Sequence, residues 1–374
     1  MKNPTKYEIP INIITPIHIG SIDTFSANEY LFLDDKVHRI DIVNFFNSSL
    51  NNRNKEKFIK LIQDENFKLS DLKYIDVDLL KSFSKYYLID KCSEFAKDNN
   101  VQIECAVKSQ NKLYIPGSSI KGAIKTALLY NCIKFNQVPD IINKVLFHDY
   151  GSIINDYFIS SHENSTIFNN ILRFLQIEDS SNFDDAPHLH EVIHWYVDTE
   201  KEKMFYKKFL TRYLETIPES TLKTTIRMNY KKKFFEDLNF SESMEKILDV
   251  NIISESLFLF ADDLINFEID FFSEFNRYDL VEFYEELMKY NHYNKPLILL
   301  GGANGVVSKN IYLKIYEYDK QNDTHFSENY AKLLFDFDDD LKFPKSRRFT
   351  YKNSEPLGWA QLDFSSYIKC RRKK

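Results

Sequence analysis

The chain has 374 residues, of which 43% are hydrophobic and 28% charged, and its 49 basic and 55 acidic side chains give a net charge of −6. This composition excludes bulk disorder, because the apolar content is sufficient to bury a large core in one elaborated domain or two ordinary ones. The acidic balance excludes a general polyanion-coating protein, which normally has a surplus of Lys and Arg, so any contact with nucleic acid is expected to be local.

The hydrophobic runs are short and the cysteines are scattered. The longest apolar runs, Leu257–Ala261 and Leu297–Leu300, fall far below the roughly 18 residues that cross a bilayer, so no transmembrane helix is predicted. No secretory signal is recognised near the start, because an apolar core is lacking there. The cysteines lack metal-clip spacing and predict reduced, unpaired thiols; they are Cys92, Cys105, Cys132 and Cys370. We therefore expect a cytoplasmic protein with no zinc bound to cysteine.

The N-terminal part of the chain changes from an extended to a helical pattern. Tyr7–Ile19 is rich in β-branched residues and has no helical period, which predicts a strand that ends at Gly20. Between residues 41 and 96, apolar residues recur three and four positions apart, as in short amphipathic helices. A short strand at Lys112–Ile115 then precedes a helix over Ile120–Phe135.

The middle and the C-terminal part predict helices around isolated strands. Residues 140–220 carry aromatic and aliphatic side chains at helical spacing and predict a mostly helical segment. In Thr221–Met228, apolar and polar residues alternate, so a strand with one basic face is expected before a second helical stretch to about residue 293. The remaining elements are strands at Leu297–Leu300, Ile311–Tyr318 and Leu357–Phe364, a basic loop at Lys345–Arg348 and a solvated basic tail at Lys369–Lys374.

The segment Tyr114–Lys125 combines a Gly-Ser-Ser loop with the start of a helix. Its two serines are expected to cap the helix, whose N-terminal amides and dipole attract phosphate. Its two lysines are one turn apart and share a helix face, and the glycine between them permits a close approach. An ordinary N-cap with a solvated lysine pair is the alternative. The candidate anion-binding residues are Gly117, Ser118, Ser119, Lys121, Gly122 and Lys125.

Three of the eight glycines of the chain lie in Gly301–Gly305. A chain with so few glycines is expected to cluster them only where positive φ or a close backbone approach is required. With Ser308 and Lys309 downstream, the loop can form a nest of backbone amides for an anion; a glycine-rich hairpin turn is the alternative. The Gly-Lys-Ser ending of a nucleoside-triphosphate loop is missing, which excludes an ATPase. The candidate residues are Gly301, Gly302, Asn304, Gly305 and Lys309.

Two histidine patterns are typical of proton-transfer or zinc-binding sites. His18 lies at the end of a predicted strand, where a histidine can transfer protons, and a packing role is the alternative. His190–His194 has the His-Glu-x-x-His pattern, in which two histidines one helical turn apart bind zinc. No histidine follows at the metzincin spacing, and Glu215 is only a generic downstream carboxylate. Ordinary histidines on an amphipathic helix are therefore favoured, and no metal site is predicted.

Three motifs together resemble the RAMP superfamily of CRISPR-associated proteins. They are Ile14-Thr-Pro-Ile-His-Ile-Gly-Ser21, Ile115-Pro-Gly-Ser-Ser-Ile-Lys-Gly-Ala-Ile-Lys125 and Gly301-Gly-Ala-Asn-Gly305, in this order. The Pro-Gly-Ser-Ser-x-Lys-Gly element is the most specific of them. More closely, the chain resembles the type III-A (Csm complex) subunit that caps the crRNA 3′ end, through the first motif, the length and the segment Leu214–Met228.

The resemblance implies an α+β fold, a modified ferredoxin-like or RRM-like palm built from N- and C-terminal strands with large helical insertions. The expected segments are the first part of the palm with a helical insertion (1–139), a helical insertion (140–220), a palm strand (221–230), a helical segment (231–295) and the last part of the palm with the glycine-rich loop (296–374). The candidate residues of the motifs, His18 included, are then expected to contact the crRNA backbone without reading its sequence, because the aromatic RNP motifs are not evident.

The implied function is that of a non-catalytic crRNA-binding subunit of a type III-A effector complex. This subunit would cap the filament at the crRNA 3′ end and support crRNA maturation and antiviral interference. The implied partners are crRNA, the repeated RAMP backbone subunit, the small helical subunit, the large polymerase-like subunit and host nucleases that trim crRNA; no cofactor or membrane is implied. The alternative is a RAMP endoribonuclease that processes precursor crRNA with His18 as base, and a remote alternative is a zinc peptidase.

Overall fold

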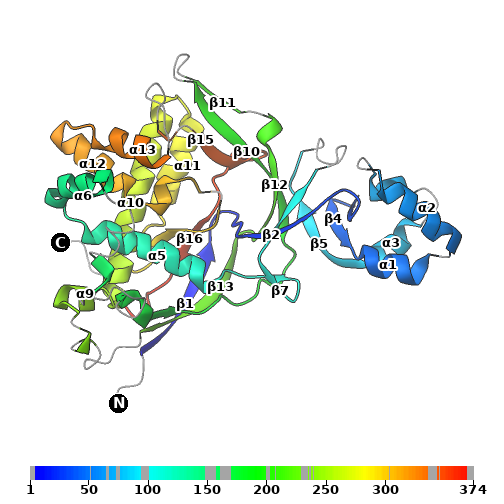
Figure 1. The fold of residues 1–374 in the computed structure, drawn as a ribbon, viewed down its shortest axis with the longest axis horizontal. Helices are drawn as coiled ribbons and strands as arrows, with labels where there is room; N and C mark the ends of the chain where they lie inside the picture. Colours follow the sequence, from blue (N-terminus) through cyan, green and yellow to red (C-terminus); the bar gives the residue numbers. More distant parts are fainter. Residues whose placement is uncertain are drawn as a thin grey trace.

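The computed structural model describes residues 5–50, 52–64, 67–72, 76–93, 101–147, 157–160, 170–198, 203–206, 208–228, 235, 237–238, 240–302, 304–335, 343–344 and 346–368. The molecule is elongated, with a small helical lobe at one end and a larger lobe of helices packed on a sheet at the other (Figure 1). Within these residues, no helix is long and apolar enough to cross a membrane. Cys370 and the predicted basic tail lie outside the described residues.

The first sheet is antiparallel and contains strands from both ends of the described chain. Its order is β14-β16-β1-β13-β9. The bounds are β1 Thr5–Ile13, β9 Leu175–Ile177, β13 Ser220–Met228, β14 Leu297–Leu299 and β16 Trp359–Leu362. In β1, Ile9, Ile11 and Ile13 are buried, whereas Glu8 is exposed. Since side chains alternate along a strand, these isoleucines form an apolar face for the sheet.

Three predicted strands of this sheet are confirmed as β13, β14 and β16. The first predicted strand is too long, because β1 ends at Ile13 and the chain then crosses to a second sheet, where Gly20 begins β2 (Gly20–Phe25). On the way, Ile17 and Ile217 exchange two backbone hydrogen bonds, each of 2.9 Å. This bridge ties the crossing segment to the second sheet.

Two long helices cover one face of the first sheet and pack against each other (Figure 1). They are α5 (Gly117–Cys132) and α10 (Val250–Glu274), in which Ile253, Leu257 and Phe260 are buried at helical spacing. Among the palm elements, the chain order β1-α5-β9-β13-α10-β14 is the βαββαβ pattern of a ferredoxin-like fold, with β16 inserted between β14 and β1. The predicted α+β fold, with a palm built from N- and C-terminal strands, is confirmed.

The second sheet contains nine described strands in the order β2-β6-β12-β10-β5-β4-β3, with β11 and β15 also paired to β10. The further bounds are β3 Tyr30–Leu33, β4 Lys36–Ile40, β5 Ser84–Asp90, β6 Ile103–Ala106, β10 His188–Asp198, β11 Lys203–Tyr206, β12 Arg212–Thr216 and β15 Ser346–Thr350. The prediction of a helical segment over residues 140–220 is therefore wrong from β9 onward. The first half of β10 is buried on both faces, which removes the alternation that marks a strand.

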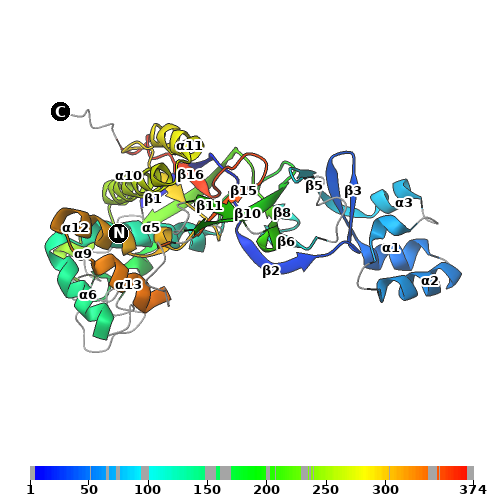
Figure 2. The same cartoon turned by 90° about the horizontal axis from the view of Figure 1, so that it is seen from above.

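The small lobe consists of α1 (Ile42–Ser49), α2 (Asn52–Ile62) and α3 (Val77–Ser82), which stand apart from the palm helices (Figure 2). These helices confirm the helical prediction for the first part of residues 41–96, whereas β5 shows that it is wrong for Ser84–Asp90. The other described elements are α6 Val138–Phe147, α9 Glu242–Lys246, α11 Tyr278–Met288, α12 Tyr312–Asn322, α13 Phe326–Phe335, the short hairpin β7 Lys108–Ser109 with β8 Lys112–Leu113, and the 3₁₀ turns η1 Leu69–Asp71, η2 Phe135–Gln137, η4 Ile171–Phe174, η5 Lys208–Leu210 and η6 Val307–Lys309.

Two predictions in the C-terminal part are wrong. The segment predicted as a strand at Ile311–Tyr318 forms most of α12, where Tyr312 and Ile315 are buried three residues apart. Its aromatic and β-branched content favours a strand locally, but packing against the palm helices decides for a helix. The predicted basic loop at Lys345–Arg348 overlaps β15, which pairs with β10.

Candidate functional site

The glycine-rich loop after β14 lies directly against the segment that contains His18. The amide of Gly302 donates a hydrogen bond of 3.2 Å to the carbonyl oxygen of His18. Gly301 has a φ of +96°, and a Cβ placed on it would lie 2.3 Å from the same carbonyl oxygen. Only glycine fits this position, because a side chain would be both strained and in collision. Two motifs from opposite ends of the chain are therefore joined through their backbones.

The ring of His18 is buried inside this junction. His18 is 5% exposed, and its Nδ1 donates a 2.7 Å hydrogen bond to the carbonyl oxygen of Glu215 in β12. A Cβ on Gly20 would lie 3.0 Å from Nε2 of His18, so the chain passes closely over the ring. Burial lowers the pKa of His18, and the hydrogen bond to the Glu215 carbonyl opposes this effect. The imidazole is neutral at pH 7 and closely packed. This environment suits a residue that positions the backbone around it, and it gives a substrate little access to the ring for proton transfer.

The N-terminus of α5 is capped from another part of the chain. Pro116 is the N-cap residue and its side chain makes no capping bond, whereas the amide of Gly117 donates at 2.8 Å to Oδ1 of Asp179. The prediction that Ser118 and Ser119 cap the helix is wrong, because both lie inside its first turn. The Asp179 carboxylate supplies the negative charge that this helix end attracts, so the Gly117 amide is already occupied.

Beyond its first turn, α5 presents a partly exposed face with two lysines, Lys121 and Lys125. Burial, and then the charge of Lys125, lower the pKa of Lys121. Apart from its chain neighbours and the surrounding helix backbone, nothing lies within 4 Å of where a Cβ on Gly122 would be, so this glycine leaves open space beside the lysines. α5 packs against η6 (Val307–Lys309), so the helix that carries these lysines lies next to the glycine-rich loop.

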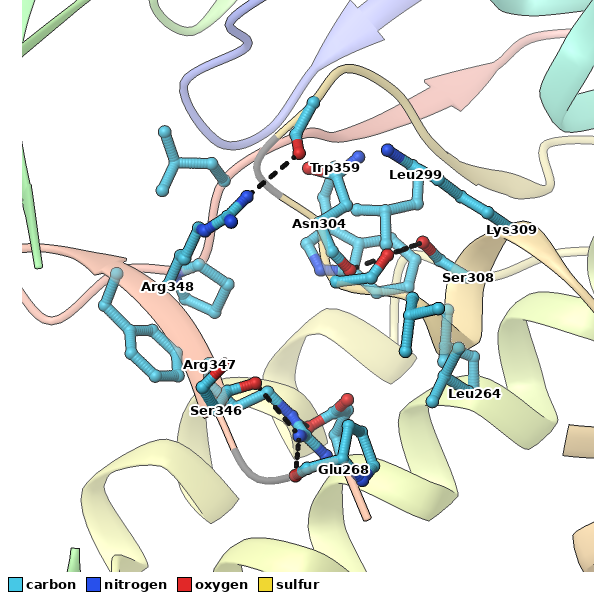
Figure 3. A pocket seen from close by; sticks show the side chains of 18 of the residues that line it. Leu264, Glu268, Leu299, Asn304, Ser308, Lys309, Ser346, Arg347, Arg348 and Trp359 are labelled. Atoms are coloured by element: carbon cyan, nitrogen blue, oxygen red, sulfur yellow. Dashed lines mark hydrogen bonds and ion pairs between the residues drawn. The ribbon is translucent and has the colours of Figure 1, made fainter. Parts of the chain in front are cut away.

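A pocket of about 420 Å³ opens between the glycine-rich loop, α10 and β15 (Figure 3). The predicted residues that line it are Gly302, Asn304, Gly305 and Lys309. Arg348 of β15 donates from Nη1 to the Gly302 carbonyl at 3.2 Å and from Nε to Nε2 of His194 at 3.1 Å. Desolvation, and then the Arg348 charge, lower the pKa of Lys309. Three cations line the pocket, and Glu268 neutralises only Arg347, so Lys309 and Arg348 favour an anionic ligand.

Two polar atoms in the pocket wall have no hydrogen-bond partner among the described residues. They are Nη2 of Arg347, a residue that is 8% exposed, and Oδ1 of Asn304. Arg347 is otherwise fixed, because its Nε donates to Oε2 of Glu268 at 2.7 Å and its guanidinium lies 4.0 Å from the centre of the Phe271 ring. Buried polar atoms of this kind usually bind water or a ligand. The wall thus offers one donor and one acceptor to a polar ligand.

This convergence of motifs agrees with a family match along most of the chain. A model of the RAMP superfamily matches residues 11–342. The chain belongs to the RAMP superfamily.

Curated relatives of this RAMP chain include two proteins named CRISPR system Cms protein Csm5. The one from Methanocaldococcus jannaschii is 25% identical over 391 residues, which cover 95% of this chain and 88% of the relative. The one from Streptococcus thermophilus is 25% identical over 209 residues, which cover 50% of this chain and 54% of the relative.

Solved structures share the fold of this RAMP chain over nearly its whole length. A chain in the cryo-EM structure of a Csm–crRNA–target RNA ternary complex of a type III-A CRISPR–Cas system has a TM-score of 0.71 at 18% identity, covering 95% of this chain and 100% of that chain. The crystal structure of Csm5 from T. onnurineus has a TM-score of 0.66 at 16% identity, covering 94% of this chain and 99% of that chain. These likenesses confirm the fold.

The His-Glu-x-x-His pattern of the RAMP chain lies on strand β10 and not on a helix. Residues four positions apart in a strand are separated by about 13 Å, so His190 and His194 do not share a metal ion. Glu191 alternates to the other face and accepts a 2.9 Å hydrogen bond from the Ser93 amide, while Nδ1 of His190 lies 2.9 Å from Oγ1 of Thr216. The remote zinc-peptidase alternative is therefore wrong.

Sequence analysis missed several residues of this RAMP site. Arg347 and Arg348 are assigned to a loop by sequence, yet both lie in β15 and line the pocket. An adjacent arginine pair is the only signal available there, and it does not indicate which strand the pair joins. Asp179, which caps α5, has no signal in the sequence. Glu215, named from the sequence only as a generic carboxylate, is fully buried in an ion pair with Lys108.

Proposed function

We propose that this chain is a crRNA-binding subunit of a type III-A CRISPR effector complex. The observation that carries the proposal is the similarity to a Csm5 protein over 95% of the chain. It is supported by the way the motifs of the family resemblance lie together: the glycine-rich loop lines a cationic pocket, its Gly302 amide binds the His18 carbonyl, and α5 packs against the adjoining η6. RNA is a polyanion, and lysines, arginines and backbone amides are the groups with which proteins hold its phosphates.

The RNA backbone crosses the lysine face of α5 and the glycine-rich loop in this proposal. Lys121 and Lys125 contact phosphates from one side, Lys309 and Arg348 from the other, and the open space at Gly122 admits the strand closely. Such a site neutralises few phosphates, so the isolated subunit binds RNA modestly and with a shallow salt dependence.

The subunit caps the complex at the crRNA 3′ end, supports crRNA maturation and antiviral interference, and does not itself cut RNA. His18 is the base that the endoribonuclease alternative requires, and its burial against the Glu215 carbonyl supports a positioning role instead. The proposed partners are crRNA, the repeated RAMP backbone subunit, the small helical subunit, the large polymerase-like subunit and host nucleases that trim crRNA. The complex is expected to act in the cytoplasm.

The test is affinity purification of the tagged chain from its native host, with sequencing of the bound RNA and mass spectrometry of the bound proteins. We expect short RNAs that share a repeat-derived 5′ tag, together with several RAMP subunits and a large polymerase-like subunit. Recovery of the chain without RNA and without such subunits contradicts the proposal.

Charge reversal on α5 sharpens this test. The double variant Lys121→Glu/Lys125→Glu should lower crRNA recovery by about tenfold, because it removes two phosphate contacts and adds repulsion. The matched control is Lys57→Glu/Lys60→Glu on α2, which makes the same charge change on exposed residues of the small lobe. An equal loss in both variants would show that net charge, and not this surface, matters.

Catalysis is tested separately with repeat-containing RNA and purified protein. We expect no cleavage by the wild-type chain. Cleavage that the His18→Ala variant abolishes would instead establish the endoribonuclease alternative.

A further inference from the structure

From His194 on, β10 has one covered face and one face with partly exposed side chains, which we call the open face. Trp195 points toward the palm helices, where the guanidinium of Arg277 lies 4.6 Å from the centre of its ring. On this face Phe349 of β15 is 1% exposed and contacts Phe272 of α10. His194 and Tyr196 point to the other face, because successive side chains of a strand alternate.

Three rings follow one another on the open face. Tyr196 is opposite Phe205 of β11, with 6.1 Å between the ring centres. His194 and Tyr196 are two residues apart on β10, with 6.4 Å between their ring centres and 25° between their planes. Phe205 is 40% exposed. We call His194, Tyr196 and Phe205 the aromatic strip.

A cation connects the aromatic strip to the glycine-rich loop. Arg348 is opposite His194 in the β10–β15 pair and donates to its Nε2, while its Nη1 donates to the carbonyl of Gly302. Burial lowers the pKa of His194 to about 4, so both of these partners of Arg348 are neutral at pH 7. The nearby carboxylate of Glu104 is held by Arg212, whose Nε donates to it at 2.6 Å, which leaves Arg348 as a cation for a phosphate. Rings flanked by a guanidinium are what proteins use to stack unpaired bases and hold their backbone.

We propose that the aromatic strip is a stacking platform for unpaired bases of single-stranded RNA, which continues the path that begins at the glycine-rich loop. The inference rests on the proposed function, since it gives the same RNA a second contact. Phosphate contacts at the loop position the strand, and the rings bind bases with little sequence preference. A protein partner is the less favoured occupant, because an apolar protein surface does not match the Arg348 charge.

The chain offers a matched pair of variants for the test. Phe205 and Tyr206 are neighbours in β11 and are 40% and 41% exposed, but they point to opposite faces. The full-length protein is titrated with a fluorescent single-stranded RNA of about 12 nucleotides and with the same RNA in a duplex. We expect Phe205→Ala to weaken single-strand binding by at least about fivefold and Tyr206→Ala by less than about twofold. Phe205→Leu, which keeps apolar volume, should behave like Phe205→Ala.

Removing bases from the RNA tests whether stacking is responsible. An RNA with abasic sites should bind the wild-type chain as weakly as intact RNA binds Phe205→Ala, and it should lose little further affinity for that variant. Equal affinity of wild type and Phe205→Ala for intact RNA overturns the stacking platform and leaves the proposed function intact. Loss of a partner subunit by Phe205→Ala at unchanged RNA affinity also overturns it, in favour of a protein contact. A wild-type chain that binds no RNA overturns both proposals.

Discussion

The two sheets of this molecule are held together by different interactions. The first packs its apolar face against α5 and α10 within one large hydrophobic core. The second has a small apolar cluster around Leu88, Ile103 and Leu189, and beside it buried polar contacts such as the ion pair of Glu215 with Lys108. A buried pair that loses one partner leaves an uncompensated charge, whereas apolar packing is insensitive to protonation. The second sheet and its junction with the palm should therefore respond most strongly to changes of charge and pH.

The largest effect is expected at the ion pair that joins the two regions. Arg347 of β15 and Glu268 of α10 are each 8% exposed. Arg347→Ala should lower the free energy of unfolding by about 3–5 kcal/mol, because Glu268 then stays buried without its partner. Urea denaturation measures this loss. The double variant Arg347→Met/Glu268→Leu should recover most of the stability, and a double variant as unstable as the single one would contradict the explanation.

Two glycines of the site should respond in opposite directions to the same change. Gly301→Ala should destabilise the junction by about 2 kcal/mol, because a positive φ and the His18 carbonyl both oppose a side chain. Gly122→Ala should stabilise α5 by about 0.5–1 kcal/mol, since its Cβ meets open space. If RNA approaches α5 closely, Gly122→Ala should nevertheless weaken RNA binding in a filter assay. Tolerance of Gly301→Ala would show that the junction adjusts easily.

A pH dependence is expected from the three histidines of β10. Burial lowers the pKa of His188 and His194 to about 4 and that of His190 to about 3, from an ordinary 6.5. As pH falls below about 6.5, these three histidines take up protons in the unfolded chain before they do so in the folded chain, so their contribution to stability is complete above this pH and declines toward pH 4. Glu355, whose pKa burial raises to about 7, contributes in the opposite direction. Urea midpoints at pH 7 and pH 5 measure the decline. His190→Gln should reduce it, while His325→Gln, at an exposed site, should not.

The strands β13 and β10 show why one sheet was predictable and the other was not. In β13, Leu222 and Ile226 are buried and Lys223 is exposed, so the alternation is visible in the sequence. The residues from Leu189 to Ile193 in β10 are all buried, because strands border it on both edges and side chains cover both faces. Alternation marks a strand only where one face contacts solvent.

The candidate site also has a part that the sequence predicts and a part that it does not. Glycines, serines and lysines of the two loops could be predicted as anion-binding candidates, because helix ends and glycine-rich turns have local signatures. The groups that contact these residues could not be predicted, because they come from distant segments of the chain. They are Asp179 at the α5 terminus, the His18 carbonyl against Gly301, and Arg348 beside the loop.

The sequence by itself determined the helices α5 and α10, through local periodicity, and the family resemblance, through short glycine-containing motifs. The α+β class and the ferredoxin-like palm followed from what this resemblance implies. Only the tertiary structure decided that β10 and β15 are strands, that α12 is a helix, that the glycine-rich loop contacts the His18 segment and that Arg348 joins this loop to the aromatic strip. The physical reason is that burial, strand pairing and desolvated charge depend on neighbours far away in the chain, which no local pattern records.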